Sequence, residues 1–257
     1  MYFGISIAKL IFVTVAMFFA GFVDSIAGGG GCISLPAYML TGLPIMNAIA
    51  SNKASAGVGY IASTFNYLRK GKIDVRVSLI SAIAGIIGGN IGGRILLMLD
   101  PSFIQKMIVL IIPFVAVFLI TKKDFGRENE FETIPEYKVI IISIVGGLLV
   151  GIYDAMIGPG SGTLAILLFA TLLKFDLKTA SGNAKILNLF SLIGSAVLFI
   201  KNGLVIWPIA VITGFADIIG SYIGSSLAIK KDTSFIRTIM IIAVAILLIK
   251  LGYDAFF

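Results

Sequence analysis

Two lysines and two aspartates lie within apolar stretches of this 257-residue chain. Asp24 precedes a run of four glycines, and Asp154 stands at the matching place before a second glycine-rich stretch. Lys53 and Lys185 follow later in each part, in the segments SNK and NAK. A charged side chain inside a membrane segment is costly and is a functional hypothesis by default. The four residues therefore predict a polar site inside a membrane protein.

The lysines are the strongest reason to expect an anion. We expect Lys53 and Lys185 to point into one cavity, together with the nearby amides of Asn52 and Asn183. Two buried ammonium groups would attract a negative ligand. The alternative is that both lysines begin deep helices and extend their charged ends to a membrane surface.

The glycine-rich stretches provide a second, independent reason. Glycine and proline interrupt a helix, and such backbone is tolerated at membrane depth only beside protein or water. New half-helices are expected to begin near Cys32 and Gly162, with partial positive charge at their N-termini. The residues expected to bind the anion there are Gly30, Gly31, Cys32, Gly160, Ser161 and Gly162. The alternative is that the glycines only allow helices to cross closely.

The carboxylates have several interpretations. Asp24 and Asp154 could carry a coupling proton, pair with a lysine, or cap the backbone of the breaks. Asp217 stands in the second part of the chain where the first part has Gly85. That difference favours a proton or cation site in one half only.

The chain consists of two similar parts. The spacing of Gly21, Asp24, Gly28 and Gly30 returns later in the chain, as do the segments around the lysines. The first part is expected to contain elements at 5–26, 32–42, 46–68, 76–98 and 102–120, and the second at 138–157, 162–173, 178–200, 205–229 and 233–254. The second element of each part is too short to span a membrane, which takes about 20 residues.

These features predict the fold class. We expect an all-α polytopic membrane protein with two inverted-topology repeats of five elements, each starting with a broken helix hairpin. The repeats would cover residues 1–120 and 137–257, joined by a polar cytoplasmic linker at 121–136. Basic residues segregate to one side of this topology, which places both termini outside an inner membrane.

Composition narrows the classes of function. Hydrophobic residues make up 58% of the chain and charged residues 13%, against about 25% in soluble domains. The net charge of +7 suits basic cytoplasmic loops, so no nucleic-acid partner is expected. Histidine is absent and Cys32 is the one cysteine. We expect no metal, no cofactor and no catalytic residue.

Small residues recur at every fourth position in two stretches, namely Ala84, Gly88 and Gly92, and Ala216, Gly220 and Gly224. Such stripes let helices pack closely. Packing within one chain is the simpler interpretation, and a homodimer interface is the alternative.

These residues resemble the TauE/SafE sulfite exporter family. The resemblance covers nearly the whole chain and rests on Asp24 with its four glycines and Pro36, the SNK motif ending at Lys53, Arg69–Asp74, the GPGSG stretch 158–162, and the NAK motif ending at Lys185. It implies a bacterial-type inner-membrane carrier for sulfur-containing oxyanions or small organic acids. Ile166 stands where the first part has Pro36, which is a departure from the pattern.

The expected function is that of a secondary transporter for a small anion such as sulfite or a sulfonate, acting by alternating access in the lipid bilayer. One alternative is a proton- or cation-coupled carrier of a neutral or zwitterionic molecule, in which the lysines pair with Asp24 and Asp154. Two further alternatives are an intramembrane enzyme, for which no nucleophile and base can be named, and a channel.

Overall fold

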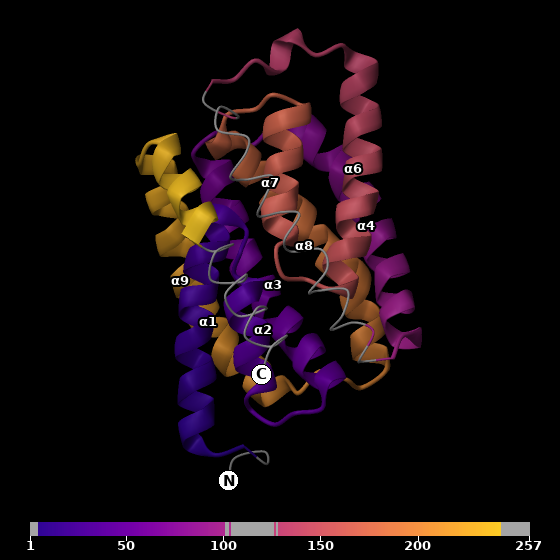
Figure 1. The fold of residues 1–257 in the computed structure, drawn as a ribbon, viewed down its shortest axis with the longest axis vertical. Coiled ribbons are helices and arrows are strands. Elements are labelled where there is room, and N and C mark those ends of the chain that lie inside the picture. The colour runs from indigo at the N-terminus through magenta and orange to yellow at the C-terminus, as the bar shows by residue number, and fades with distance from the viewer. Residues whose placement is uncertain (1–4, 101–102, 104–125, 127, 243–257) are drawn as a thin grey trace.

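The structure is a computed structural model that describes residues 5–100, 103, 126 and 128–242. The regular structure in these residues is helical. The helices are α1 (Ile7–Ala27), α2 (Gly31–Met39), α3 (Ile45–Arg69), α4 (Val75–Met98), the short 3-10 helix η1 (Phe131–Thr133), α6 (Glu136–Met156), α7 (Ser161–Leu172), α8 (Leu177–Lys201), α9 (Trp207–Lys230) and a final helix Thr233–Ile242. Figure 1 shows them as one elongated bundle.

The all-helical fold predicted from the sequence is confirmed. Helices α1 to α4 and α6 to α9 lie close to the ranges that we expected. The expected element at 102–120 falls outside the described residues, and the one at 233–254 is described only as far as Ile242.

Local sequence explains where helices begin. Asp74 caps α4 by accepting a hydrogen bond from the backbone N–H of Val77, at 2.9 Å. Asp176 caps α8 in the same way for Lys178 and Thr179. A side chain that accepts such a bond satisfies an N–H group that has no partner within the helix.

Glycines break the chain at the two predicted places. Gly28 ends α1 with a φ of 76°, and Gly158 and Gly160 follow α6 with φ of 84° and 82°. Only glycine adopts this left-handed backbone without strain. Helix α2 then has 9 residues and α7 has 12, both shorter than a membrane span.

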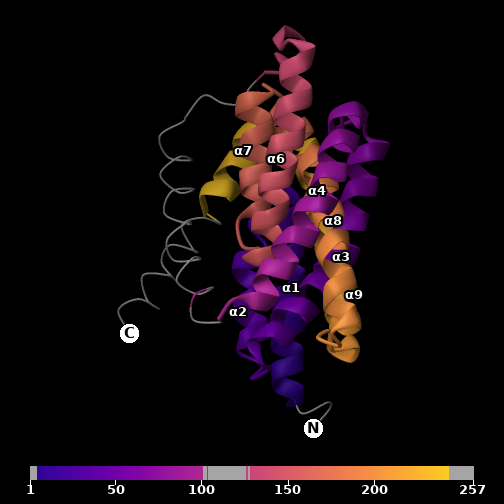
Figure 2. The ribbon, with the colours of Figure 1, turned by 90° about the vertical axis from the view of Figure 1, so that its right-hand side faces the viewer.

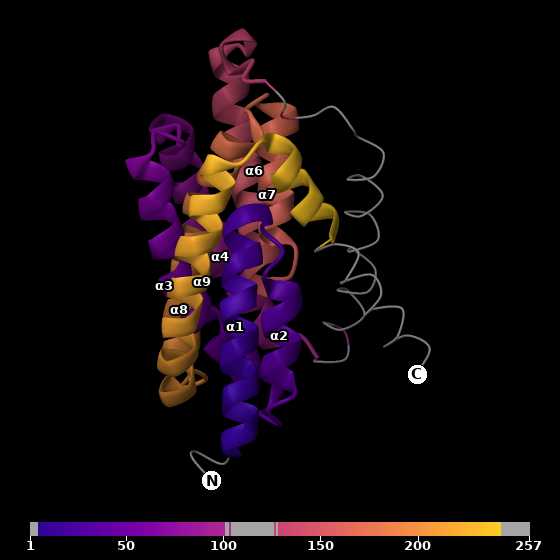
Figure 3. The same cartoon turned by 90° about the vertical axis from the view of Figure 1, so that its left-hand side faces the viewer.

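The two hairpins enter the bundle from opposite ends, and their tips meet (Figures 2 and 3). At the tips, the backbone N–H of Thr163 donates to the carbonyl of Gly28 at 3.2 Å, and the Thr163 hydroxyl donates to Ala27 at 2.9 Å. Opposed entry is the arrangement that inverted repeats would produce. The symmetry relation between the two parts of the chain stays a prediction.

The fourth helix of each part packs against the other part. Helix α4 lies mainly against α6 and α8, whereas α9 lies mainly against α1 and α3 (Figure 1). The described chain therefore forms a first bundle of α1, α2, α3 and α9 and a second bundle of α4, α6, α7 and α8. Helices α3 and α8 provide the main contact between the two bundles.

The small-residue stripes make these exchanged contacts. Gly88 and Gly92 face the backbone of α6, and Gly220 and Gly224 face the backbone of α1. A Cβ atom at Gly220 would come within 2.0 Å of the carbonyl oxygen of Phe18. Packing within the chain is therefore what the stripes do.

Polarity is distributed as in a membrane protein. Large apolar side chains such as Phe65, Ile83 and Phe215 are more than half exposed, while many serines, threonines and asparagines are buried. Five helices of the described chain (α1, α4, α6, α8 and α9) are long and apolar enough to cross a membrane. Helix α3 is equally long but more polar, because its buried face carries side chains such as Ser51, Asn52 and Lys53.

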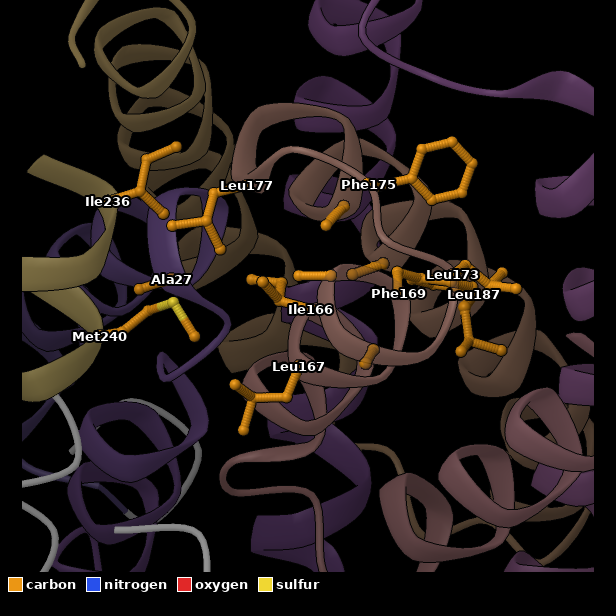
Figure 4. Packing of buried hydrophobic residues seen from close by; sticks show 14 of the residues in the cluster. Ala27, Ile166, Leu167, Phe169, Leu173, Phe175, Leu177, Leu187, Ile236 and Met240 are labelled. Carbon is orange, nitrogen blue, oxygen red and sulfur yellow. The ribbon is translucent and has the colours of Figure 1, made fainter. Parts of the chain in front are cut away.

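An apolar cluster surrounds the short helix α7 (Figure 4). Ile166 and Phe169 of α7 are fully buried there, in contact with residues of α1, α8 and the final helix, including Ala27, Leu187 and Met240. This packing holds a helix that has few hydrogen-bonded turns of its own.

Two basic side chains connect helix ends. Arg76 at the start of α4 pairs with Glu136 at the start of α6, and Lys178 at the start of α8 donates to the carbonyl of Ile229 near the end of α9, at 3.1 Å. The expected segregation of basic residues to one side of the membrane stays a prediction.

We predict that Gly220→Ala lowers the thermal stability of the purified protein, whereas Gly214→Ala on the same helix does not. Alanine is the better helix former by about 1 kcal/mol at both positions. At Gly220, however, the added methyl meets backbone, and overpacking costs about 1–3 kcal/mol. At Gly214 it meets a flexible methyl of Val58 at 3.0 Å. Equal melting temperatures in detergent would contradict this packing.

Candidate functional site

The two hairpin tips and the middle of α3 line one internal cavity. Gly30 and Gly31 contribute from the first tip, and Gly158 and Pro159 from the second. Other polar lining residues are Asp24, Ser34, Asn52, Lys53, Tyr60, Asp154, Asp217 and Ser221. The cavity thus lies where the two bundles meet.

Lys185 reaches across to the first bundle. Its side chain is fully buried on α8, and its ammonium group lies 2.7 Å from Oδ2 of Asp24 on α1. The same group donates to the backbone carbonyl of Asp24 at 2.5 Å and lies 5.4 Å from the ring centre of Tyr60. A buried charge that is paired and hydrogen-bonded in this way avoids most of its desolvation penalty.

Lys53 makes the reciprocal contact. It lies on α3 in the first bundle, and its ammonium group is 3.5 Å from Oδ2 of Asp154 on α6 in the second. It donates to the backbone carbonyl of Asp154 at 2.5 Å. Each lysine therefore pairs with the aspartate of the other repeat. Both lysines are buried, so neither extends to a surface. Lys53 lines the cavity, whereas Lys185, which we expected to point into it as well, does not.

The same aspartates also hold the breaks. Asp24 accepts a hydrogen bond from the backbone N–H of Gly30 at 3.0 Å, just before α2. Asp154 accepts bonds from the hydroxyls of Ser161, at the start of α7, and Ser191, at 2.6 and 3.0 Å. Pairing and support of the break are therefore not alternatives, because each aspartate does both.

Asp217 is buried without such a lysine. It lies on α9, is 3% exposed, and no ion pair joins it to any lysine or arginine in the described residues. Its carboxylate oxygens lie against the backbone of Gly21 on α1 and Gly59 on α3. The hydroxyl of Ser221 lies beside the same two glycines.

Some predicted binding residues lie elsewhere. Asn183 does not line the cavity, and its side-chain oxygen instead accepts bonds from the N–H of Asp74 and the hydroxyl of Ser78, both at 2.9 Å. Two residues along a helix turn a side chain by about 200°, so Asn183 cannot share a face with Lys185.

The second hairpin also differs from expectation. Its cavity-lining residues are Ile157, Gly158 and Pro159, whereas Gly160, Ser161 and Gly162 lie behind them. Gly162 packs against Gly28 of the other tip. In the first hairpin Gly30 and Gly31 line the cavity as predicted, but Cys32 is buried next to them and does not.

Asn52 is the predicted amide that reaches the cavity. It is 8% exposed, and its Oδ1 atom has no hydrogen-bond partner in the described chain. A buried polar atom without a partner is costly unless water or a ligand satisfies it. Asn52 therefore has an unused hydrogen-bond acceptor at the wall of the cavity.

Sequence reasoning missed Tyr60 and Ser191. Tyr60 follows Lys53 by two helical turns, so it faces the same side of α3, and that spacing could have identified it. Ser191 follows Lys185 by six residues, and its contact with Asp154 depends on how two separate helices pack. In the described residues, no cluster of three or more histidine, cysteine or acidic residues could hold a metal ion.

We predict that neutralising one member of a pair destabilises the protein more than neutralising both. Asp24→Asn alone or Lys185→Met alone leaves a buried charge unpaired, which costs about 3–5 kcal/mol. The combined variant should recover a large part of that loss. A double-mutant cycle measured by thermal unfolding in detergent tests the coupling.

The mismatched combination is the control. Lys185→Met with Asp154→Asn removes one partner from each pair and should be about as unstable as the sum of its single changes. Recovery in this variant, and none in the matched one, would show that each lysine pairs within its own repeat.

Comparison with known proteins identifies the family to which this chain belongs. The family model described as sulfite exporter TauE/SafE matches residues 13–251. The chain is 32% identical to the "Probable membrane transporter protein YfcA" of Escherichia coli strain K12 over 240 residues, 92% of this chain and 87% of that protein. It is 29% identical to the "Probable membrane transporter protein ORF9" of Sinorhizobium over 95% of this chain and 93% of that protein.

A relative from Haemophilus influenzae, named "Probable membrane transporter protein", is 28% identical over 98% of this chain and 96% of its own length. No solved structure matches significantly. The family match includes both hairpins, and the chain belongs to the sulfite exporter TauE/SafE family of membrane transporters.

Proposed function

We propose that this membrane transporter is a secondary carrier of a small anion such as sulfite, a sulfonate or a related organic acid. The observation that carries the proposal is the pair of buried lysines at the meeting point of two helix breaks. The family match supports the substrate class, since its description names a sulfite exporter.

The electrostatics of the tips suit an anion. Helices α2 and α7 begin at the two breaks, and the first turn of a helix presents N–H groups that have no acceptor within that helix. Those groups give the N-terminus roughly half a positive charge. Gly30 and Gly31 bring the first of these N-termini to the cavity, next to Lys53.

The anion would bind by exchanging with a carboxylate. In the described state Lys53 is already paired with Asp154, at a longer distance than Lys185 is with Asp24. An oxyanion entering beside Lys53 could accept from its ammonium group while Asp154 keeps its bonds to Ser161 and Ser191. Lys53 would therefore contact the substrate, and Lys185 would hold the site in shape.

Alternating access would move the two bundles against each other. The units that move would be the four-helix bundles and not the two repeats, because α4 and α9 pack with the opposite repeat. Both lysine–aspartate pairs cross from one bundle to the other. Rocking would therefore loosen or tighten them, which couples occupancy of the site to the conformation.

The membrane potential would contribute to the direction of transport. Moving one elementary charge across 100 mV is worth about 2.3 kcal/mol, which favours export of an anion that crosses alone from a cell that is negative inside. A proton that crossed with each monovalent anion would cancel this effect, and the pH gradient would then set the direction. We place the protein in the inner membrane with the basic end of the bundle in the cytoplasm and both termini outside.

The rival function is carriage of a neutral or zwitterionic molecule. The observation that favours it is that both lysines already have carboxylate partners. A site with balanced charges can bind a ligand that carries no net charge. The two functions differ in one respect. Transport of an anion still requires the positive charge of Lys53 when Asp154 has been neutralised, whereas transport of a neutral or zwitterionic molecule does not.

We predict saturable counterflow of labelled sulfite in proteoliposomes containing the parent protein. The double variant Lys53→Met with Asp154→Asn should fold, because it leaves no unpaired charge from this ion pair. It should lose counterflow by about 100-fold or more, because position 53 no longer carries an ammonium group to bind the anion. Lys201→Ala, which changes an exposed lysine at a helix end, is the matched control and should keep full activity.

Transport of sulfite by the pairwise variant at the parent's rate would overturn the anion site at Lys53 and favour the rival function. Loss of folding is excluded separately by size-exclusion chromatography and by the melting temperature. Absence of flux in the parent with sulfite, a sulfonate and a small carboxylate would overturn the proposed substrate class.

A further inference from the structure

The third carboxylate of the cavity differs from the other two in its surroundings. Asp24 and Asp154 each have a lysine and further hydrogen-bond donors. Asp217 lines the same cavity, is nearly fully buried, and has no ion-pair partner in the described part of the chain. A buried carboxylate without an ion-pair partner is costly while it carries a charge, because burial removes the water that would stabilise that charge.

Two glycines make the space that Asp217 occupies. A Cβ atom at Gly59 would lie 1.7 Å from Oδ2 of Asp217, and one at Gly21 would lie 2.4 Å from Oδ1. Any other residue at either position would collide with the carboxylate. The backbones of α1 and α3 therefore form a tailored recess for this side chain.

The second bundle has no such recess. Its equivalent of Asp217 is Gly85, which lies against Gly151 and close to Ser191. The two contacts thus differ on both sides: Asp217 faces Gly59 in one bundle, whereas in the other Gly85 lies against Leu187 and close to the backbone of Ser191. Ser191 uses its hydroxyl to hold Asp154. The two bundles therefore differ at both positions of this contact, and not only at the position of Asp217.

The charge of the cluster depends on this residue. The cluster contains two lysines and three carboxylates, so it carries one net negative charge when all of them are ionised. A proton on Asp217 makes the cluster neutral. An anion would enter the neutral cluster much more readily, because like charges at short range in a buried site repel strongly.

We propose that Asp217 carries the proton that accompanies the anion, so that the protein moves one proton together with each monovalent anion. The inference rests on the proposed function. Asp217 acts on the anion through the charge of the cavity and need not touch it. Protonation admits the anion, and release of the anion on the far side allows the proton to leave.

Within the described residues, six other titratable groups surround Asp217. Asp24 lies on α1, Tyr38 on α2, Lys53 and Tyr60 on α3, Asp154 on α6 and Lys185 on α8. The tyrosine hydroxyls are neutral through the range used in transport assays. The four remaining groups form the two ion pairs.

Binding and protonation must influence each other equally. The first test is the affinity for methanesulfonate, which stays a monovalent anion over the whole range, measured by calorimetry at several pH values. In the parent the affinity should fall by about tenfold for each pH unit once Asp217 loses its proton. In Asp217→Asn, which mimics the neutral form, the affinity should no longer depend on pH. A slope kept in the variant, or no slope in the parent, would overturn the proposal.

The second test separates coupling from transport. Asp217→Asn should lose accumulation of the sulfonate driven by a pH gradient and should keep exchange of internal for external sulfonate, because exchange needs no release of the proton. Ser225→Ala, at a buried hydroxyl two turns along α9 and away from the cavity, should keep both. Uphill accumulation by Asp217→Asn, or loss of exchange in a folded variant, would overturn the proposal.

If the parent protein neither binds nor transports any of the anions, the proposed function is wrong. Infrared spectroscopy then tests separately whether Asp217 carries a proton. The C=O stretch of a protonated carboxyl can still be recorded on the purified protein at neutral pH. A band present in the parent and absent in Asp217→Asn upholds a proton on this residue, and identical spectra would overturn it.

Discussion

The reciprocal ion pairs are the constraint on which the architecture depends. Lys53 and Lys185 are buried at membrane depth, where a charge without a partner is prohibitively costly. Each finds its partner only in the opposite repeat, at Asp154 and Asp24. The two repeats must therefore face each other with their hairpins opposed, and the exchanged positions of α4 and α9 keep them in that relation.

The glycines follow from the same constraint. An aspartate can pair with a lysine across the bundle and also accept a hydrogen bond from the backbone of the helix break. Both are possible only if the chain turns sharply within a few residues of the aspartate. Gly28 and Gly30 provide that turn after Asp24, with one left-handed residue and one N–H group within reach of the carboxylate. Bulkier residues at the tips would also separate Gly28 from Gly162, where the two hairpins touch.

The fold could be predicted largely from sequence, because it depends on signals that are local. Apolar length, glycine breaks and repeated spacing identified the helices and the two short half-helices. The partner of each lysine could not be predicted, because pairing depends on how distant helices pack. Asn52 and Asn183 show the limit most clearly: each stands beside its lysine in the sequence, yet one lines the cavity and the other supports α4. One residue of difference in spacing turned Asn183 to another face of its helix.

A site with nearly balanced charges suits a carrier better than a strongly positive one would. Two unpaired lysines would bind an anion tightly and release it slowly, whereas a carrier must let its ligand leave on the other side. In this protein the ammonium group of Lys53 has a resident carboxylate, Asp154, that could take the anion's place when it departs. Under the proposed function the anion would compete with this internal partner of similar chemistry, so the net free energy of binding would be a small difference between two large interactions. A small change in the geometry of the two bundles, or in the charge of the cavity, is then enough to tip the balance between binding and release.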